Sequence, residues 1–195
     1  MAITWDNADG KWEFYLDSVH RFSIDNFRTG QIVPNNSLII IGQEQDEFSG
    51  GFSPDQALQG CLSRLNIWDT VLPVEVVVSF AKDPGYDNGN VLSWSFLRHH
   101  LSDIQASQPS NVVSSVGKSN VALTFSQMSN LNYAVLPYDG SIIAQLTVCT
   151  WIDLTASSTD APCLISYATS TSFNEFYIFF YESKCLISLE SQKYE

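Results

Sequence analysis

The sequence predicts an all-β domain, built as a two-layer antiparallel sandwich with one short helix. Apolar and polar residues alternate with a period of two in many short segments, as at Trp12, Phe14 and Leu16. Turn-forming residues, for example those at positions 7–10, separate these segments. Only one stretch, residues 73–82, favours a helix. Many short strands around a single helix are typical of a sandwich, in which each sheet buries one face against the other.

The expected elements follow the chain in order. Residues 3–5 and 12–16 form a hairpin, and a polar loop then runs to Asn36. Further strands are expected at 38–41, 64–68, 92–96, 121–125, 133–136, 146–152, 164–167, 176–181 and 186–189. Pro73 suits the first turn of the helix, whose valines require packing to hold them helical. Between residues 98 and 120 Ser, Gln, Pro and Asn replace the apolar periodicity, which predicts a linker.

Residues 42–56 concentrate oxygen-bearing side chains in one loop. These side chains are Glu44, Gln45, Asp46, Glu47, Asp55 and Gln56. Gly50 and Gly51 allow the backbone to turn so that both ends of the loop face one point, and the apolar run at 38–41 ties the loop to a buried strand. Calcium binds about 6–8 oxygen atoms from carboxylates, amides and carbonyl groups. The loop therefore favours a calcium site over a solvated acidic turn.

Composition limits the classes of partner. The chain has 195 residues, 45% of them hydrophobic, which is enough for a core. Its formal net charge is −12, from 21 acidic and 9 basic residues without a basic cluster. That charge argues against nucleic acid and anionic membranes as partners and suits a bound cation. No segment reaches the roughly 18 apolar residues of a membrane span, and no secretory signal is recognisable at the start.

Several segments carry a resemblance to a known family. They are IIIGQEQDEFSGGF from Ile39, LNIWDTVL from Leu65 and VLSWSFL from Val91. Together, across residues 3–97, they resemble the second half of a pentraxin domain, a calcium-dependent extracellular recognition module. The segments LTVCTW from Leu146 and ISYATSTSFNE from Ile165 resemble the first half. The two halves therefore stand in reversed order.

The resemblance implies a jelly-roll sandwich with its halves in circularly permuted order. We divide the chain into residues 1–97, the second half of the domain, residues 98–120, a linker, and residues 121–195, the first half. The chain then either spans the junction of two tandem domains or closes on itself as a permutant, and the two are compatible. Closure is expected because half a sandwich leaves apolar faces uncovered. An open sheet edge is also expected, since no segment joins residue 195 to residue 1.

The resemblance also implies a set of calcium ligands. They are Glu44, Gln45, Asp46 and Gln56 from the loop, with Asn174 from the other half. Ser53 falls where the family has an acid, and Phe173 replaces an aspartate beside Asn174, while Asp55 is an auxiliary candidate. Because calcium affinity depends on the number of charged ligands, we expect weak binding of one ion. Phe173 is expected to contact the apolar part of a bound ligand.

The function that the resemblance implies is extracellular recognition. Bound Ca2+, still short of ligands, would accept oxygens from a phosphorylated or carbohydrate ligand, and no catalytic residue is needed. Because a secretory signal is absent, we expect a fragment of a longer secreted protein with neighbouring domains. The alternative is a structural or protein-interaction sandwich whose calcium site has decayed. A glycoside hydrolase is disfavoured, because the acid pattern that begins at Glu44 and Asp46 has Ser49 in its third position.

The four cysteines are not spaced like zinc ligands. They are Cys61, Cys149, Cys163 and Cys185. The resemblance implies a disulfide between the strand of Cys149 and the first strand, where this chain has Ala2. Cys149 is therefore expected to be either a buried free thiol or bonded outside this sequence. Cys163 and Cys185 lie on neighbouring expected strands and either pair or remain free.

Overall fold

The computed structural model describes residues 1–80, 82, 88–99, 122–125, 129–154, 161–181 and 184–189. Its strands are β1 (Ala2–Asp6), β2 (Lys11–Leu16), β3 (Val19–Ile24), β4 (Ser37–Ile41), β5 (Gly60–Trp68), β6 (Leu123–Phe125), β7 (Ala134–Tyr138), β8 (Gln145–Leu154), β9 (Cys163–Thr169), β10 (Phe176–Tyr181) and β11 (Lys184–Leu189). Two α-helices, α1 (Val74–Ser79) and α2 (Trp94–His99), and one 3-10 turn, η1 (Pro54–Gln56), complete the described elements.

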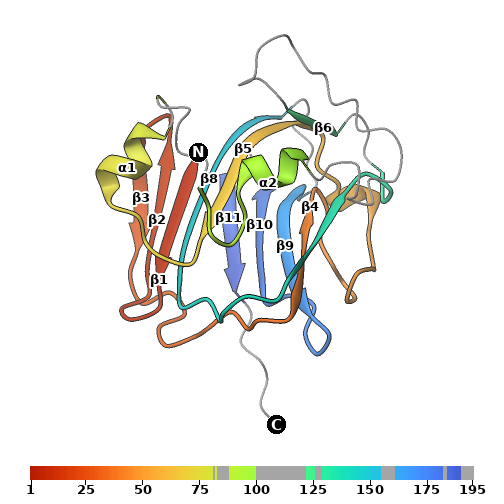
Figure 1. Cartoon of the computed structure of the whole chain (residues 1–195), viewed down its shortest axis with the longest axis horizontal. Helices are drawn as coiled ribbons and strands as arrows, with labels where there is room; N and C mark the ends of the chain where they lie inside the picture. Colours follow the sequence, from red (N-terminus) through yellow and green to blue (C-terminus); the bar gives the residue numbers. More distant parts are fainter. Residues whose placement is uncertain are drawn as a thin grey trace.

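The strands form two antiparallel sheets, which Figure 1 shows as overlapping layers. The six-stranded sheet has the order β3-β2-β1-β8-β5-β6, and the five-stranded sheet has the order β11-β10-β9-β4-β7. The expected all-β sandwich is therefore confirmed. Within the described residues β11 ends the five-stranded sheet and β10 lies inside it, while the expected open edge stays a prediction.

Each sheet contains strands from both halves of the chain. β1 pairs with β8 from Ala2↔Cys149 to Asp6↔Gln145. β4 lies between β7 and β9, and β5 pairs with both β6 and β8. The two halves therefore close on each other, as the permuted order requires. The domain limits 1–97, 98–120 and 121–195 stay a prediction, since residues 100–121 lie outside the described part of the chain.

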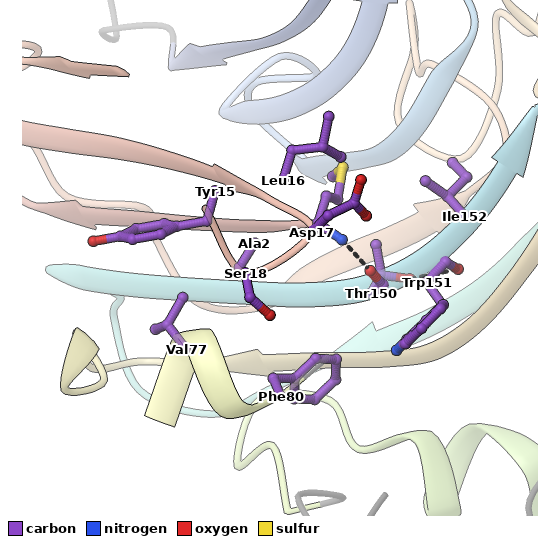
Figure 2. Close-up of a pocket in the computed structure, with 11 residues that line it drawn as sticks. Ala2, Tyr15, Leu16, Asp17, Ser18, Val77, Phe80, Thr150, Trp151 and Ile152 are labelled. Atoms are coloured by element: carbon purple, nitrogen blue, oxygen red, sulfur yellow. Dashed lines mark hydrogen bonds between the residues drawn. The ribbon is translucent and has the colours of Figure 1, made fainter. Parts of the chain in front are cut away.

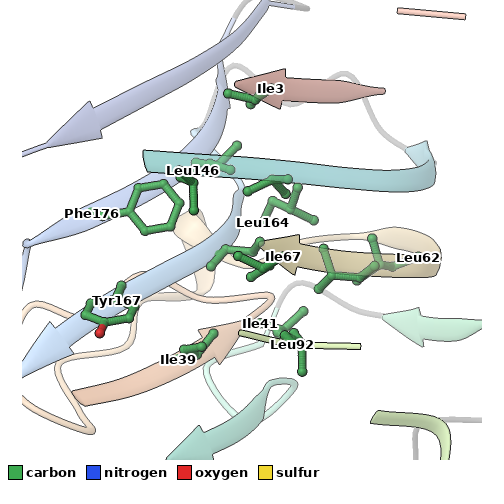
Figure 3. Close-up of a cluster of buried hydrophobic side chains, with 14 of the residues drawn as sticks. Ile3, Ile39, Ile41, Leu62, Ile67, Leu92, Leu146, Leu164, Tyr167 and Phe176 are labelled. Atoms are coloured by element: carbon green, nitrogen blue, oxygen red, sulfur yellow. The ribbon is translucent and has the colours of Figure 1, made fainter. Parts of the chain in front are cut away.

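The main core lies between the sheets. Figure 3 shows Ile3 and Ile67 of the six-stranded sheet in one cluster with Ile39 and Tyr167 of the five-stranded sheet. Successive residues of a strand point to opposite faces, so Ala2, next to Ile3, lies on the outer side of its sheet. A second cluster on that outer side contains Ala2, Tyr15, Trp68, Val77, Phe80 and Cys149. It holds α1, the helix expected within residues 73–82, by packing.

A strand was expected at residues 92–96, and this prediction is wrong. The segment enters α2 at Trp94, and the Ser93 hydroxyl accepts a hydrogen bond from the Phe96 amide at 3.2 Å. That contact is a helix N-cap. Trp94 and Leu97 are buried, 4% and 0% exposed, and stand three residues apart on one helical face. Burial of this face outweighs the period-two alternation in the sequence, and the described residues contain two α-helices where one was expected.

A polar loop was expected between the first hairpin and Asn36, and β3 lies within it instead. Every residue of β3 is exposed, and the strand pairs only with β2 at the edge of the six-stranded sheet. An edge strand without a buried face gives no period-two signal, so the pattern could not reveal it. Neither described helix is both long and apolar enough to cross a membrane.

Candidate metal centre

The loop after β4 folds back over the outer face of the five-stranded sheet, where Gln45 anchors it. Gln45 is fully buried, 0% exposed. Its side-chain Nε2 donates to the Ser166 carbonyl at 3.2 Å and to the Leu38 carbonyl at 3.3 Å. Its Oε1 accepts from the Ser49 amide at 3.1 Å, and its main-chain N–H donates to Ser166 Oγ at 3.1 Å. The Gln45 side chain therefore anchors the loop, and the main-chain carbonyl of Gln45 faces Asn174.

Glycine closes the loop where the sequence predicts a turn. Glu47 and Gly50 exchange main-chain hydrogen bonds of 3.3 and 2.9 Å. Gly51 has a φ of +72°, and a Cβ there would lie 2.7 Å from Asp46 Cβ. Any other residue at position 51 would be strained and would clash. The turn brings the η1 segment back toward Glu44.

Glu44 is the centre of the assembled site. The Gln56 side-chain nitrogen, delivered by η1, donates to Glu44 Oε2. The other end of this amide, Gln56 Oε1, is buried and accepts no hydrogen bond from the described part of the chain. A buried amide oxygen without a donor is costly unless something else satisfies it. The amide that faces Glu44 therefore has an oxygen end that its present orientation leaves unsatisfied.

Asn174 reaches the other carboxylate oxygen from the first turn before β10. One end of its amide lies 3.2 Å from Glu44 Oε1, 3.2 Å from the Gln45 carbonyl oxygen and 3.1 Å from the Phe173 carbonyl oxygen. The structure thus brings Glu44, Gln45, Gln56 and Asn174 together from the two halves. Phe173 joins them through its main-chain carbonyl, a contact that its side chain could not have suggested.

These spacings fit a calcium ion. Calcium–oxygen distances are about 2.3–2.6 Å in geometries such as the pentagonal bipyramid. Two oxygens at about 2.4 Å from one ion, separated by about 72–90°, stand roughly 2.8–3.4 Å apart. With its amide oxygen at the shared end, Asn174 meets that spacing with three other oxygens. The donor set of one carboxylate, two amides and two carbonyls is chemically suited to Ca2+.

The remaining predicted ligands lie at the surface. Asp46 and Asp55 are exposed. Phe173 is 47% exposed, so its ring is accessible beside Asn174. Across the described residues no group of three or more His, Cys, Asp or Glu side chains could hold a metal. The centre therefore relies on amide and carbonyl oxygens around a single carboxylate.

Sequence comparison decides the family once this geometry is known. A family model, described as the Pentaxin family, matches residues 1–109. The chain belongs to the Pentaxin family. The resemblance inferred from the sequence segments is thereby confirmed.

Named relatives of this pentaxin chain are much longer proteins. The "Sushi, von Willebrand factor type A, EGF and pentraxin domain-containing protein 1" of Rattus norvegicus is 36% identical over 96 residues, which are 48% of this chain and 3% of that protein. Neuronal pentraxin-2 of Homo sapiens is 34% identical over 94 residues, 48% of this chain and 22% of that protein. The Pentraxin fusion protein of Xenopus laevis is 29% identical over 101 residues, 52% of this chain and 24% of that protein. No solved structure gives a significant match.

The two positions at which the resemblance implies a disulfide lie opposite each other, but one of them has no sulfur. Ala2 lies directly opposite Cys149. Figure 2 shows Ala2 in a cleft that Tyr15, Val77 and Phe80 also line, on the outer side of the six-stranded sheet. Cys149 is a free thiol, 0% exposed, and burial raises its pKa to about 12. Within this chain Cys149 is a buried free thiol, and a bond to a cysteine outside this sequence stays a prediction.

Cys163 and Cys185 do not pair. Both are free, because they lie on β9 and β11 with β10 between them. Burial, followed by the negative charge of Glu44, raises the pKa of Cys163 well above its ordinary value. The thiol of Cys163 contacts the Ile165 carbonyl oxygen at 3.2 Å. It is therefore a core residue of β9 behind the metal centre.

Proposed function

We propose that this pentaxin chain is an extracellular calcium-dependent recognition module that binds a phosphorylated or carbohydrate ligand. The observation that supports the proposal is the convergence of Asn174 with Glu44, Gln45 and Phe173 within 3.1–3.2 Å. These residues come from opposite halves of the chain, so the arrangement exists only in the closed sandwich.

The chain's own residues would hold one ion. Glu44 contributes the carboxylate, Asn174 and Gln56 contribute amide oxygens, and Gln45 and Phe173 contribute main-chain carbonyls. Ca2+ takes about 6–8 oxygens, so one to three positions would remain for water or ligand oxygens. Bound there, the ion supplies the positive charge that attracts phosphate or hydroxyl oxygens of the ligand.

The affinity for calcium would be weak. Only one carboxylate lies in the inner set, while the exposed Asp46 and Asp55 stand as auxiliary ligands. Affinity in oxygen sites rises with ligand charge. The exposed ring of Phe173 lies beside the ion position, where it would contact the apolar part of a ligand.

A thermal-melt series tests the metal step. The purified chain is melted in EDTA, in millimolar Ca2+ and in millimolar Mg2+. Ca2+ at about one hundred times its Kd would stabilise the fold by about 2.7 kcal/mol, which is roughly 5–11 °C for a chain of this size. Retention on an immobilised phosphomonoester or a neutral polysaccharide, with elution by EDTA, then tests the ligand step. A cooperative melt that ignores Ca2+ would sink the mechanism.

A second candidate is a structural or protein-interaction module of a larger protein. The single carboxylate of the centre favours it, as does the length of the relatives, of which the chain covers 3–24%. Neighbouring domains would then be the partners. A calcium-insensitive melt together with unchanged stability of a Glu44→Gln variant would favour this candidate. Neither candidate involves a catalytic residue, a nucleic acid or membrane insertion.

A further inference from the structure

The amide of Asn174 has two chemically different orientations at the metal centre. The end that faces the site lies 3.1–3.2 Å from three oxygens, those of Glu44, Gln45 and Phe173. With nitrogen at this end, the amide donates hydrogen bonds to oxygen acceptors. With oxygen at this end, four oxygens crowd together, which is unfavourable unless a cation lies among them. The two orientations therefore suit two different states of the site.

Gln56 repeats this chemistry on the other side of Glu44. Its nitrogen donates to Glu44 Oε2, while its buried Oε1 accepts no hydrogen bond within the described residues. Each oxygen of the Glu44 carboxylate thus faces an amide. Hydrogen bonds to a charged acceptor are stronger than neutral ones, so two amide nitrogens can partly replace the charge of an ion.

We propose that the Asn174 and Gln56 amides latch the metal-free site and that each rotates by about half a turn to offer its oxygen when Ca2+ binds. The inference deepens the proposed function and rests on it. An amide exchanges its nitrogen and oxygen on rotation with almost no change of shape, so the backbone need not move. Calcium binds only the unlatched molecules. The apparent affinity of the site for calcium is therefore its intrinsic affinity multiplied by the unlatched fraction.

An Asn174→Asp variant separates the latch from the ligand. Aspartate keeps an oxygen for the metal but has no N–H to donate, and it places a second carboxylate about 3.2 Å from Glu44 Oε1. The melting temperature in EDTA should therefore fall by a few degrees. The apparent Kd for Ca2+ should fall about tenfold or more, because ligand charge rises and the latch is lost. Gln56→Glu should act in the same two directions.

The matched control is Asn26→Asp. Asn26 is exposed in the turn that follows β3 of the six-stranded sheet, whereas the candidate metal centre lies on the five-stranded sheet. The substitution adds the same charge without touching the centre. Neither the EDTA melting temperature nor the calcium response should change beyond about one degree. This control corrects for the general effect of one more negative charge on a chain of net charge −12.

Side-chain amide signals in a ¹H–¹⁵N NMR spectrum report whether the Asn174 and Gln56 NH₂ groups are hydrogen-bonded in the unaltered chain. The NH₂ pairs are assigned by their disappearance in Asn174→Asp and Gln56→Glu, or by selective labelling if either variant fails to fold. In EDTA both pairs should be protected from solvent exchange, and Ca2+ should remove that protection. Amides that exchange freely in EDTA overturn the latch.

The outcomes distinguish the latch from the function on which it rests. A lower EDTA melting temperature with a stronger calcium response supports both. An unchanged EDTA melting temperature with a stronger calcium response overturns the latch and leaves the calcium site intact. A third outcome is that the amides are protected and the EDTA melting temperature falls, but calcium has no effect. The hydrogen bonds are then a purely structural contact, and both the proposed function and the calcium-driven rotation of the amides are overturned.

Discussion

Replacing Ala2 with cysteine should create a disulfide to Cys149. Met1 and Thr150 exchange two hydrogen bonds, from Met1 N to Thr150 O at 2.7 Å and from Thr150 N to Met1 O at 3.0 Å. The next pair along the ladder, Ala2↔Cys149, is therefore a non-hydrogen-bonded pair. Its Cα atoms should be about 4.5 Å apart, within the range of about 4.4–6.8 Å that disulfides span.

The expected gain follows from the length of the closed loop. Cross-linking residues 2 and 149 closes almost 150 residues, for which the chain-entropy relation gives about 5 kcal/mol. Measured values are typically about 2–4 kcal/mol, because native strain offsets part of the entropy. For a chain of this size that corresponds to a rise of roughly 4–16 °C in Tm. Ala2 borders the cleft of Figure 2, so its surroundings leave room for the added sulfur.

Thiol titration and melting check this prediction together. Under denaturing conditions the oxidised variant should show three reactive thiols, from four native cysteines plus one less two in the bond. The double variant Ala2→Cys, Cys149→Ala cannot form the bond and is the control. Five reactive thiols after mild oxidation would show that the β1–β8 register is wrong. Three thiols without a rise in Tm would refute the loop-entropy argument.

Three further variants test the site and the core. Glu44→Gln should abolish any calcium-dependent rise in Tm, because it removes the carboxylate that faces Asn174, and the exposed Glu47→Gln is its control in the same melts. The Cys149 thiol has a pKa of about 12 in the folded chain and about 8.5 in the unfolded chain. Above about pH 9 the unfolded chain therefore binds fewer protons than the folded chain. Stability should therefore fall as pH rises from about 9 toward 12, and Cys149→Ala should reduce that slope in melts at pH 8 and 10.5. Trp94→Ala should cost about 3–5 kcal/mol in urea unfolding, since Trp94 is 4% exposed, whereas the half-exposed Phe96→Ala should cost far less.

Much of the sheet framework is predictable because its strands bury one face. Period-two alternation marks β2, and continuous apolar runs mark β4 and β9, which are buried on both faces along most of their length. β3 escapes prediction because none of its side chains is buried. α2 escapes it because Trp94 and Leu97 share a helical face within a segment that also alternates. In both cases tertiary contacts, and not local pattern, decide the element.

The site is predictable only as a set of residues. The sequence places Glu44, Gln56 and Asn174 in it, but it cannot show that the Gln45 side chain turns into the sheet. It also gives no sign that Phe173 contributes a carbonyl oxygen, since every residue has one. Ser166 is a polar residue within the apolar run of β9, and that single anomaly is the available signal for the anchor of the loop.

The anchor links the metal centre to closure of the sandwich. Gln45 belongs to the segment before the expected linker, and Ser166 belongs to β9 in the segment after it. Burying this glutamine without these partners would lower the stability of the fold by about 1–3 kcal/mol for each unsatisfied polar group. The loop therefore takes its shape only when β9 is paired beside β4. Glu44 and Asn174 lie together only when the two halves are joined. A calcium ion held by both would therefore bind the closed sandwich and stabilise it relative to the separated halves.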